Sequence, residues 1–195
     1  MPKSALLMIE FQNEWLDPKG KLYSLFSDGK LRDTAVYNAQ LALQHAHKLK
    51  IPVIYTAMGF SCDYAELGKT DFGLRGAIPK AKTWQQGGES IHPEFKPQPQ
   101  DYVVANKKGG SAFAHTDLDL YLRTNGISRL YIAGFALHVC ILATAWSAHD
   151  LGYEVIILED AVAAFTQSQQ DFVLKELVHH FGHSQKTAAF LQLNA

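Results

Sequence analysis

Short apolar runs alternate with longer amphipathic stretches along most of this chain. Apolar, often β-branched residues form runs of strand length, at residues 5–10, 51–58, 101–107, 129–134, 153–160 and 187–193. Apolar residues at helical spacing lie between several of these runs, at residues 31–50, 116–125, 138–151 and 167–181. Gly126, Gly152 and Gly182 follow the last three of these stretches, as is typical of helix ends.

Alternating strands and helices predict a parallel sheet covered by helices on both faces. We predict a three-layer, doubly wound α/β fold with a mostly parallel six-stranded sheet in the Rossmann-like order 3-2-1-4-5-6. The chain has 195 residues and contains no Pro/Gly/Ser-rich linker, so a single domain over residues 1–195 is expected.

The composition indicates which binding partners and which cellular compartment to expect. The formal net charge of −1 gives no basis for binding nucleic acid or an anionic membrane, which leaves a small-molecule substrate as the expected partner. Only two cysteines occur, Cys62 and Cys140, as is typical of a reducing compartment. Glu10 interrupts the N-terminal apolar run, and no apolar stretch is long enough to span a bilayer. We therefore expect a soluble, cytoplasmic protein.

Cys140 lies where a predicted strand turns into a predicted helix. Unpaired N–H groups and the helix dipole at such a position favour an anion, so the thiol is expected to lose its proton more readily than usual. The alternative is a buried structural cysteine, since free cysteine is among the most buried residue types. Other residues must decide between a nucleophile and a core residue.

The carboxyl ends of parallel strands meet at one edge of a sheet, which is where ligands bind in open α/β folds. The first strand ends at Glu10, the third at Lys107 or Lys108, and the fifth at Asp160. Each has a plainer explanation: a solvated carboxylate, a surface charge or, for Asp160, a cap on the next segment. The arrival of a carboxylate, an ammonium and the Cys140 thiol at one edge nevertheless favours a catalytic site.

Three segments together resemble the isochorismatase-like cysteine hydrolases, a superfamily that includes nicotinamidases and N-carbamoyl amide hydrolases. They are ALLMIEFQNEW at residue 5, KKGGSAF at residue 107 and GFALHVC at residue 134. The resemblance implies an Asp–Lys–Cys triad, whose matching positions are Glu10, Lys107 and Cys140. The family's four-residue gap from lysine to the serine of Ser-Ala-Phe selects Lys107 over Lys108.

Two positions depart from the family pattern. Glu10 replaces the aspartate and is one methylene longer, but it has the same charge and a similar intrinsic pKa, so it can still act as a base. Leu137 replaces the threonine that usually stands three residues before the cysteine, which makes the pocket more apolar.

Further site features follow from the turn before the helix and from the resemblance. The backbone N–H groups of Ala136 and Cys140 are candidates for an oxyanion hole. The resemblance implies a cis peptide bond between Phe135 and Ala136, and a homo-oligomer. Trp15, Leu137 and His138 are candidate pocket residues, although Trp15 could equally be ordinary core.

The motifs predict neither a cofactor nor a metal. The first strand is not followed by the G-x-G-x-x-G of a dinucleotide site, and GGSAF around Ser111 is neither a P-loop nor a nucleophile elbow. The nicotinamidase-type Asp-x-His metal motif after the second strand is missing. His179, His180 and His183 could ligate a metal, but positive groups are common at helix ends.

These residues lead to one expected function and two alternatives. We expect cysteine-dependent hydrolysis of a C–N bond in a small amide or carbamoyl-type substrate, through a thioester intermediate. One alternative is a non-catalytic binding homologue that kept the fold after glutamate replaced aspartate. The other is vinyl-ether hydrolysis of a chorismate-like acid. The segment from about Gly59 to Trp84 matches the family poorly, and selectivity is expected to lie there.

Overall fold

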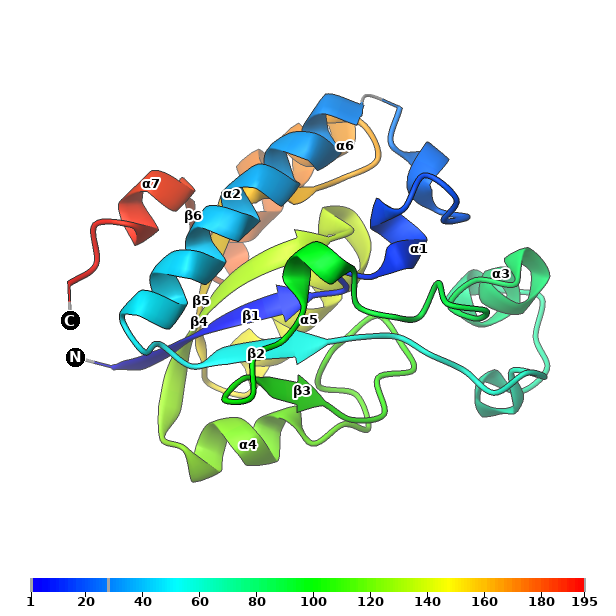
Figure 1. Ribbon diagram of the computed structural model, residues 1–195, viewed down its shortest axis with the longest axis horizontal. Coiled ribbons are helices and arrows are strands. Elements are labelled where there is room, and N and C mark those ends of the chain that lie inside the picture. The colour runs from blue at the N-terminus through cyan, green and yellow to red at the C-terminus, as the bar shows by residue number, and fades with distance from the viewer. Residues whose placement is uncertain (1, 28, 195) are drawn as a thin grey trace.

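The computed structural model describes residues 2–27 and 29–194, and these contain one sheet of six parallel strands (Figure 1). The strands are β1 Lys3–Ile9, β2 Val53–Thr56, β3 Tyr102–Val104, β4 Ile127–Phe135, β5 Glu154–Ala163 and β6 His183–Gln185. Their order is β3-β2-β1-β4-β5-β6, and all neighbouring strands pair in parallel. The predicted strand order is therefore confirmed.

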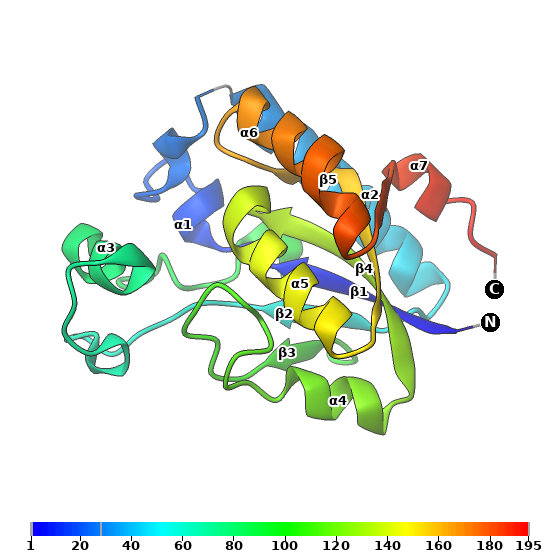
Figure 2. The same cartoon turned by 180° about the vertical axis from the view of Figure 1, so that it is seen from behind.

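Helices lie on both faces of this sheet, as predicted. Their bounds are α1 Asn13–Leu16, α2 Gly29–Lys48, α3 Gly73–Ala81, α4 Leu118–Thr124, α5 Leu142–Asp150, α6 Gln167–Phe172 and α7 Thr187–Phe190. Helices α2 and α7 lie in front of the sheet in Figure 1, and α5 and α6 lie in front of it when seen from behind in Figure 2. Helices α1 and α3 lie beyond the carboxyl ends of β1 and β2.

Small side chains let α2 approach the sheet closely. Ala35, Ala39, Ala42 and Ala46 recur at helical spacing, and all are fully buried. At the centre of the sheet, residues 5–9 of β1 are also fully buried. Gly134 on β4 has a φ of 130°, and a Cβ atom there would lie 2.0 Å from the carbonyl oxygen of Ile9. This glycine allows β4 to lie against β1 next to the predicted site.

The prediction of a strand at residues 187–193 is wrong. The sixth strand is the polar edge segment His183–Gln185, which pairs only with β5, and Thr187–Phe190 is helix α7. Thr187 and Phe190 are the buried residues of α7, and their spacing of three is helical rather than alternating. Asp160 accepts hydrogen bonds from the backbone N–H and the hydroxyl of Thr187, both at 2.7 Å. Its carboxylate therefore anchors α7 and is not available to the site.

Two predicted helices are not regular α-helices over their whole length. Residues 137–141 form a π-helical turn before α5, and residues 173–177 form another directly after α6, followed by a 3₁₀ turn at residues 178–180. Hydrophobic spacing does not separate these forms, since they differ by only one residue in hydrogen-bond register. Strand β3 is also shorter than predicted and ends at Val104, so Lys107 lies in the loop that follows it.

Candidate active site

Glu10 and Lys107 form a buried ion pair at the carboxyl edge of the sheet. Glu10 directly follows β1 and is 0% exposed, and Lys107 is 1% exposed. The Lys107 Nζ donates to Glu10 Oε1 at 2.5 Å and to the carbonyl oxygen of Gly109 at 2.6 Å. The second oxygen of Glu10, Oε2, accepts a hydrogen bond from Trp15 Nε1 at 3.2 Å. Both carboxylate oxygens are therefore held by donors from different segments.

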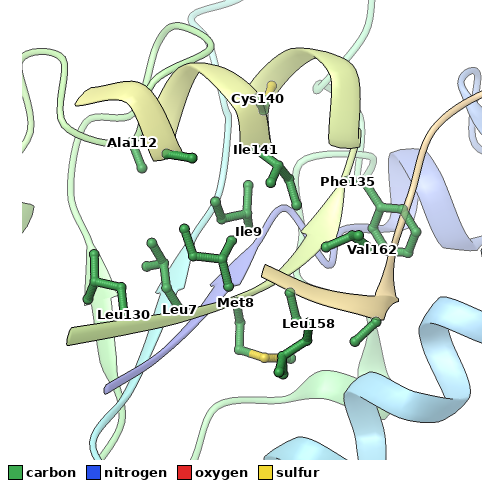
Figure 3. Close-up of a cluster of buried hydrophobic side chains, with 14 of the residues drawn as sticks. Leu7, Met8, Ile9, Ala112, Leu130, Phe135, Cys140, Ile141, Leu158 and Val162 are labelled. Carbon is green, nitrogen blue, oxygen red and sulfur yellow. The ribbon is translucent and has the colours of Figure 1, made fainter. Parts of the chain in front are cut away.

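Cys140 lies on the turn above the same strand. Figure 3 shows it on the helical turn above Leu7 and Ile9 of β1, with its sulfur directed away from these side chains. The N–H groups of Val139 and Ile141 both donate to the Ala136 carbonyl, at 3.0 and 3.3 Å, which closes the turn. The peptide bond between Phe135 and Ala136 is cis. The Glu10 carboxylate, the Lys107 ammonium and the Ala136 N–H all lie close enough to the Cys140 thiol to influence its pKa.

Burial raises the pKa of the Cys140 thiol well above its usual value, and the neighbouring Glu10 carboxylate raises it further. Lys107 and the Ala136 N–H act in the opposite direction but do not outweigh these effects. The expectation that the turn lowers this pKa is therefore wrong, because the thiol is almost fully removed from water. Burial acts to lower the pKa of Lys107, but Glu10 and Cys140 raise it above its usual value. The resting site thus holds a thiol beside an ammonium–carboxylate pair.

This protonation state predicts how Cys140 reacts with alkylating reagents. Iodoacetamide attacks the thiolate, so alkylation of Cys140 should be slow at pH 7 and should accelerate steadily as the pH rises. Cys62 is exposed and serves as the internal comparison, and it should be labelled before Cys140 at pH 7. Peptide mapping after limited exposure at pH 7 and pH 9 measures both rates. Faster labelling of Cys140 than Cys62 at pH 7 would contradict the raised pKa.

An apolar pocket of about 340 Å³ opens onto Cys140. Trp15 of α1, Val139 and Phe165 line it together with Cys140. Helix α3 contributes side chains at helical spacing to its opposite wall, and these are Leu74, Ala77, Ile78 and Ala81. Thr83 and Trp84 follow α3 and complete that wall. The segment expected to determine selectivity therefore does line the pocket.

Trp15 is the one predicted pocket residue that lines this cavity. It is 4% exposed and packs against Phe26, Trp84, Phe135 and Phe165. The other two predicted pocket residues, Leu137 and His138, do not line it, because the π-helical turn presents Val139 and Cys140 instead.

Leu137 and His138 lie on the turn but not on the pocket wall. Leu137 is buried, and the ring of His138 lies edge-on to Phe165 with the ring centroids 4.5 Å apart. Burial lowers the pKa of His138. Its Nδ1 has no hydrogen-bond partner among residues 2–27 and 29–194, and His138 is not among the groups that shift the pKa of the Cys140 thiol.

Sequence reasoning missed two buried polar residues that hold the pocket wall in place. Gln12 Nε2 donates to the carbonyls of Met58 and Glu89, and Gln12 Oε1 accepts from the Met58 N–H at 2.8 Å. The Glu14 carboxylate accepts from the N–H groups of Trp84 and Lys21, at 2.7 and 2.8 Å. Both residues stand in the ALLMIEFQNEW segment, where polar residues after a buried strand are the only available signal.

The histidine-rich segment near the C-terminus does not form a compact ligand set. The rings of His179 and His180 lie in a 3₁₀ turn with their centroids 4.1 Å apart and their planes tilted by 43°, and His183 begins β6. Within the part of the chain that the structure describes, no group of three or more His, Cys, Asp or Glu residues is placed to hold a metal ion. In the same residues, no helix combines the length and apolarity needed to cross a membrane.

The doubly wound sheet in the order β3-β2-β1-β4-β5-β6 defines a three-layer α/β fold with Rossmann-like topology, and the comparisons with known proteins give its family. The model of the isochorismatase domain matches residues 4–189. The chain therefore belongs to the isochorismatase family and is a hydrolase.

Individual relatives share the sequence over different lengths. The ureidoacrylate amidohydrolase RutB of Acinetobacter baylyi is 30% identical over 172 residues, which cover 82% of this chain and 70% of RutB. The isochorismatase family protein YwoC of Bacillus subtilis is 36% identical over 100 residues. That match covers 51% of this chain and about half of YwoC, 52% of its length. An isochorismatase family protein from Burkholderia thailandensis has the same fold with a TM-score of 0.80, at 26% identity over 99% of this chain and 97% of that protein.

Proposed function

We propose that this protein hydrolyses a C–N bond in a small amide or carbamoyl-type substrate, through a thioester on Cys140. The observation that carries the proposal is the buried contact between Glu10 and Lys107 beside a thiol that lines a pocket. A thiol, a base and a fixed cation are the parts that covalent acyl transfer needs. The similarity to RutB, whose name denotes an amidohydrolase, supports the amide-cleaving branch of the family.

Acylation starts from the protonated thiol. Glu10 accepts the thiol proton as the Cys140 sulfur attacks the substrate carbonyl carbon. The carbonyl oxygen becomes an oxyanion, and the backbone N–H groups of Ala136 and Cys140 are its proposed donors. The C–N bond then breaks, and Glu10 returns the proton to the leaving nitrogen. The products of this step are an amine and a thioester on Cys140.

Deacylation uses the same carboxylate a second time. Glu10 takes a proton from a water molecule, and the resulting hydroxide attacks the thioester carbonyl. The C–S bond breaks, the acid leaves, and Cys140 regains its proton from Glu10. In the resting site Glu10 and Cys140 raise the pKa of Lys107, so this residue enters the reaction as an ammonium. While Glu10 holds the transferred proton, the ammonium offsets the negative charge of each tetrahedral intermediate.

Two measurements on the wild-type protein test this proposal. Ammonia release is measured across a panel of small primary amides and carbamoyl compounds, and the protein is then quenched in acid during turnover. Peptide mass spectrometry should find the acyl group on Cys140. Release of ammonia without an acyl adduct would contradict the thioester route, and failure to cleave any amide would favour the binding homologue.

Replacing Glu10 with glutamine should lower turnover by about 10² or more, because the side chain keeps its size but can no longer accept a proton. The same change removes the anion that raises the Cys140 pKa. Alkylation of Cys140 at pH 8 should therefore become faster while turnover falls. Steady-state rates and iodoacetamide labelling of the Glu10→Gln protein measure the two opposite effects. Unchanged turnover would remove Glu10 from the mechanism.

Replacing Glu10 with aspartate tests whether the site has adapted to the longer glutamate side chain. Trp15 Nε1 and Lys107 Nζ contact the carboxylate where glutamate places it. Shortening the side chain opens a gap to both donors, so we expect turnover to fall by about tenfold although the base remains. A rise in turnover would instead show that the glutamate degrades an aspartate site.

A further inference from the structure

We propose that the substrate carries an uncharged, apolar group next to its scissile amide, and that amides bearing a carboxylate are excluded. This inference rests on the proposed amide hydrolysis and specifies the substrate class for that site. It follows from the chemistry of the pocket that opens onto Cys140.

The pocket walls are almost entirely apolar. Trp15, Trp84 and Phe165 supply aromatic surface, and Leu74, Ala77 and Ile78 supply aliphatic surface. Trp15 and Trp84 are each 4% exposed, and their rings meet edge-on with centroids 5.9 Å apart. Buried tryptophans in mutual contact are held in place, so this wall has a fixed shape that suits a flat or extended apolar group.

The carboxylate next to the wall is already engaged with the protein. The Glu14 carboxylate is 1% exposed and accepts N–H groups of Trp84 and Lys21, so it tethers the wall without facing the pocket. Thr83 and Cys140 are uncharged polar residues that line the cavity, and Thr83 Oγ1 and Trp84 Nε1 have no hydrogen-bond partner among the described residues. These two atoms can contact a neutral polar group, but neither carries a positive charge that would pair with a carboxylate. A substrate carboxylate placed among these walls would lose its hydration without gaining an ion pair, which is strongly unfavourable.

Among the described residues that line the pocket, Lys21 is the single charged one. It is exposed, and its ammonium donates a hydrogen bond to the backbone carbonyl of Lys82. Its hydrogen bond therefore ties it to the chain that follows α3. Lys21 is nevertheless the obvious competing receptor for an anionic substrate, and the test includes it.

Matched pairs of amides separate an apolar from an anionic substrate. Butanamide, hexanamide and octanamide are compared with succinamic, adipamic and suberamic acids, which have the same number of carbons in the chain but end in a carboxylate. From butanamide to hexanamide, kcat/KM should rise by about fourfold per methylene. Each carboxylated amide should be cleaved at least about 100-fold less efficiently than its apolar partner.

Binding to the Cys140→Ala protein keeps this inference separate from the proposed function. Binding is followed by the fluorescence of Trp15 and Trp84, which both line the pocket. Hexanamide should bind and adipamic acid should not.

If hexanamide binds but the wild-type protein cleaves no amide, the pocket inference stands and the proposed hydrolysis fails. If adipamic acid is cleaved or bound as strongly as hexanamide, the inference is overturned. Loss of adipamic acid binding in Lys21→Met would then identify Lys21 as its receptor. Absence of hexanamide binding also overturns it.

An added charge at the pocket rim gives a second test. Leu74 lines the pocket and is 40% exposed, so arginine can replace it with its charged end in water. In Leu74→Arg, the kcat/KM ratio of adipamic acid to hexanamide should rise at least about tenfold, because the guanidinium can pair with the carboxylate. Leu120→Arg adds the same charge on α4, where Leu120 is 70% exposed and outside the pocket, and should leave the ratio unchanged. An unchanged ratio in Leu74→Arg would show that the substrate tail does not lie in this pocket.

Discussion

Replacing Cys140 with alanine should abolish amide hydrolysis, with a loss of at least about 10⁴-fold in kcat. The sulfur is the atom that forms the covalent bond in the proposed route, and no other thiol can substitute for it. Cys62, the other cysteine, is exposed and outside the pocket. Ammonia release under saturating substrate measures the loss, and the limit is set by the rate without protein.

A matched variant controls for general effects of removing a thiol. Cys62→Ala should keep the wild-type rate, because Cys62 is exposed and does not line the pocket. Circular dichroism should give the same spectrum for both variants, since alanine fits the space that a cysteine leaves. Substantial turnover by Cys140→Ala would overturn the thioester mechanism.

Replacing Lys107 with methionine should destabilise the fold and stop turnover together. The Lys107 ammonium is fully buried against the Glu10 carboxylate, and both side chains are 0% exposed. Methionine would leave that carboxylate buried without a cation, which lowers the free energy of unfolding by about 3–5 kcal/mol. Turnover should fall by about 10³-fold for two reasons. The Cys140 pKa rises further without the ammonium that lowers it, and no cation offsets the charge of the oxyanion.

Lys108→Met provides the comparison for urea unfolding and for turnover. Lys108 is half-exposed, and it pairs with Glu66 at 3.2 Å and contacts the carbonyl of Gly59. Loss of this surface pair should lower the free energy of unfolding by less than about 1 kcal/mol and leave the rate of hydrolysis within twofold. Equal effects of the two substitutions would contradict the assignment of Lys107 to the site.

Patterns within single segments predict five of the six strands and place Glu10 and Cys140 at the edge of the sheet, whereas the choice of Lys107 over Lys108 needs the family resemblance. Buried parallel strands are continuous apolar runs, so β1, β2, β4 and β5 are visible in the sequence, and the residues that follow them converge by topology. Strand β6 was not predictable in this way, because His183–Gln185 is a polar edge strand with one partner. Helix α3 does carry apolar residues at helical spacing, but Gly73, Gly76 and Pro79 argue against a helix there.

The shape of the pocket and the pKa of the Cys140 thiol both depend on tertiary packing. Side chains from α1, α3, the π-helical turn and residue 165 meet at the pocket, and no local pattern relates them. A helix terminus lowers the pKa of a thiol, but burial of Cys140 acts in the opposite direction and outweighs it. A local dipole effect is worth roughly 1 kcal/mol, whereas desolvation of a fully buried group is worth several times more.

The side chains of Gln12 and Glu14 bind the segment from Met58 to Glu89 only through the backbone groups of that segment. They bind N–H and C=O groups of Met58, Trp84 and Glu89, which every amino acid except proline can supply. At Gly88 a Cβ atom would lie 2.1 Å from Glu14 Oε2, so glycine is required at that position. The exposed side chains of this segment can therefore change without loss of these backbone attachments. New substrate preferences can evolve there while the acid, the lysine and the cysteine stay untouched.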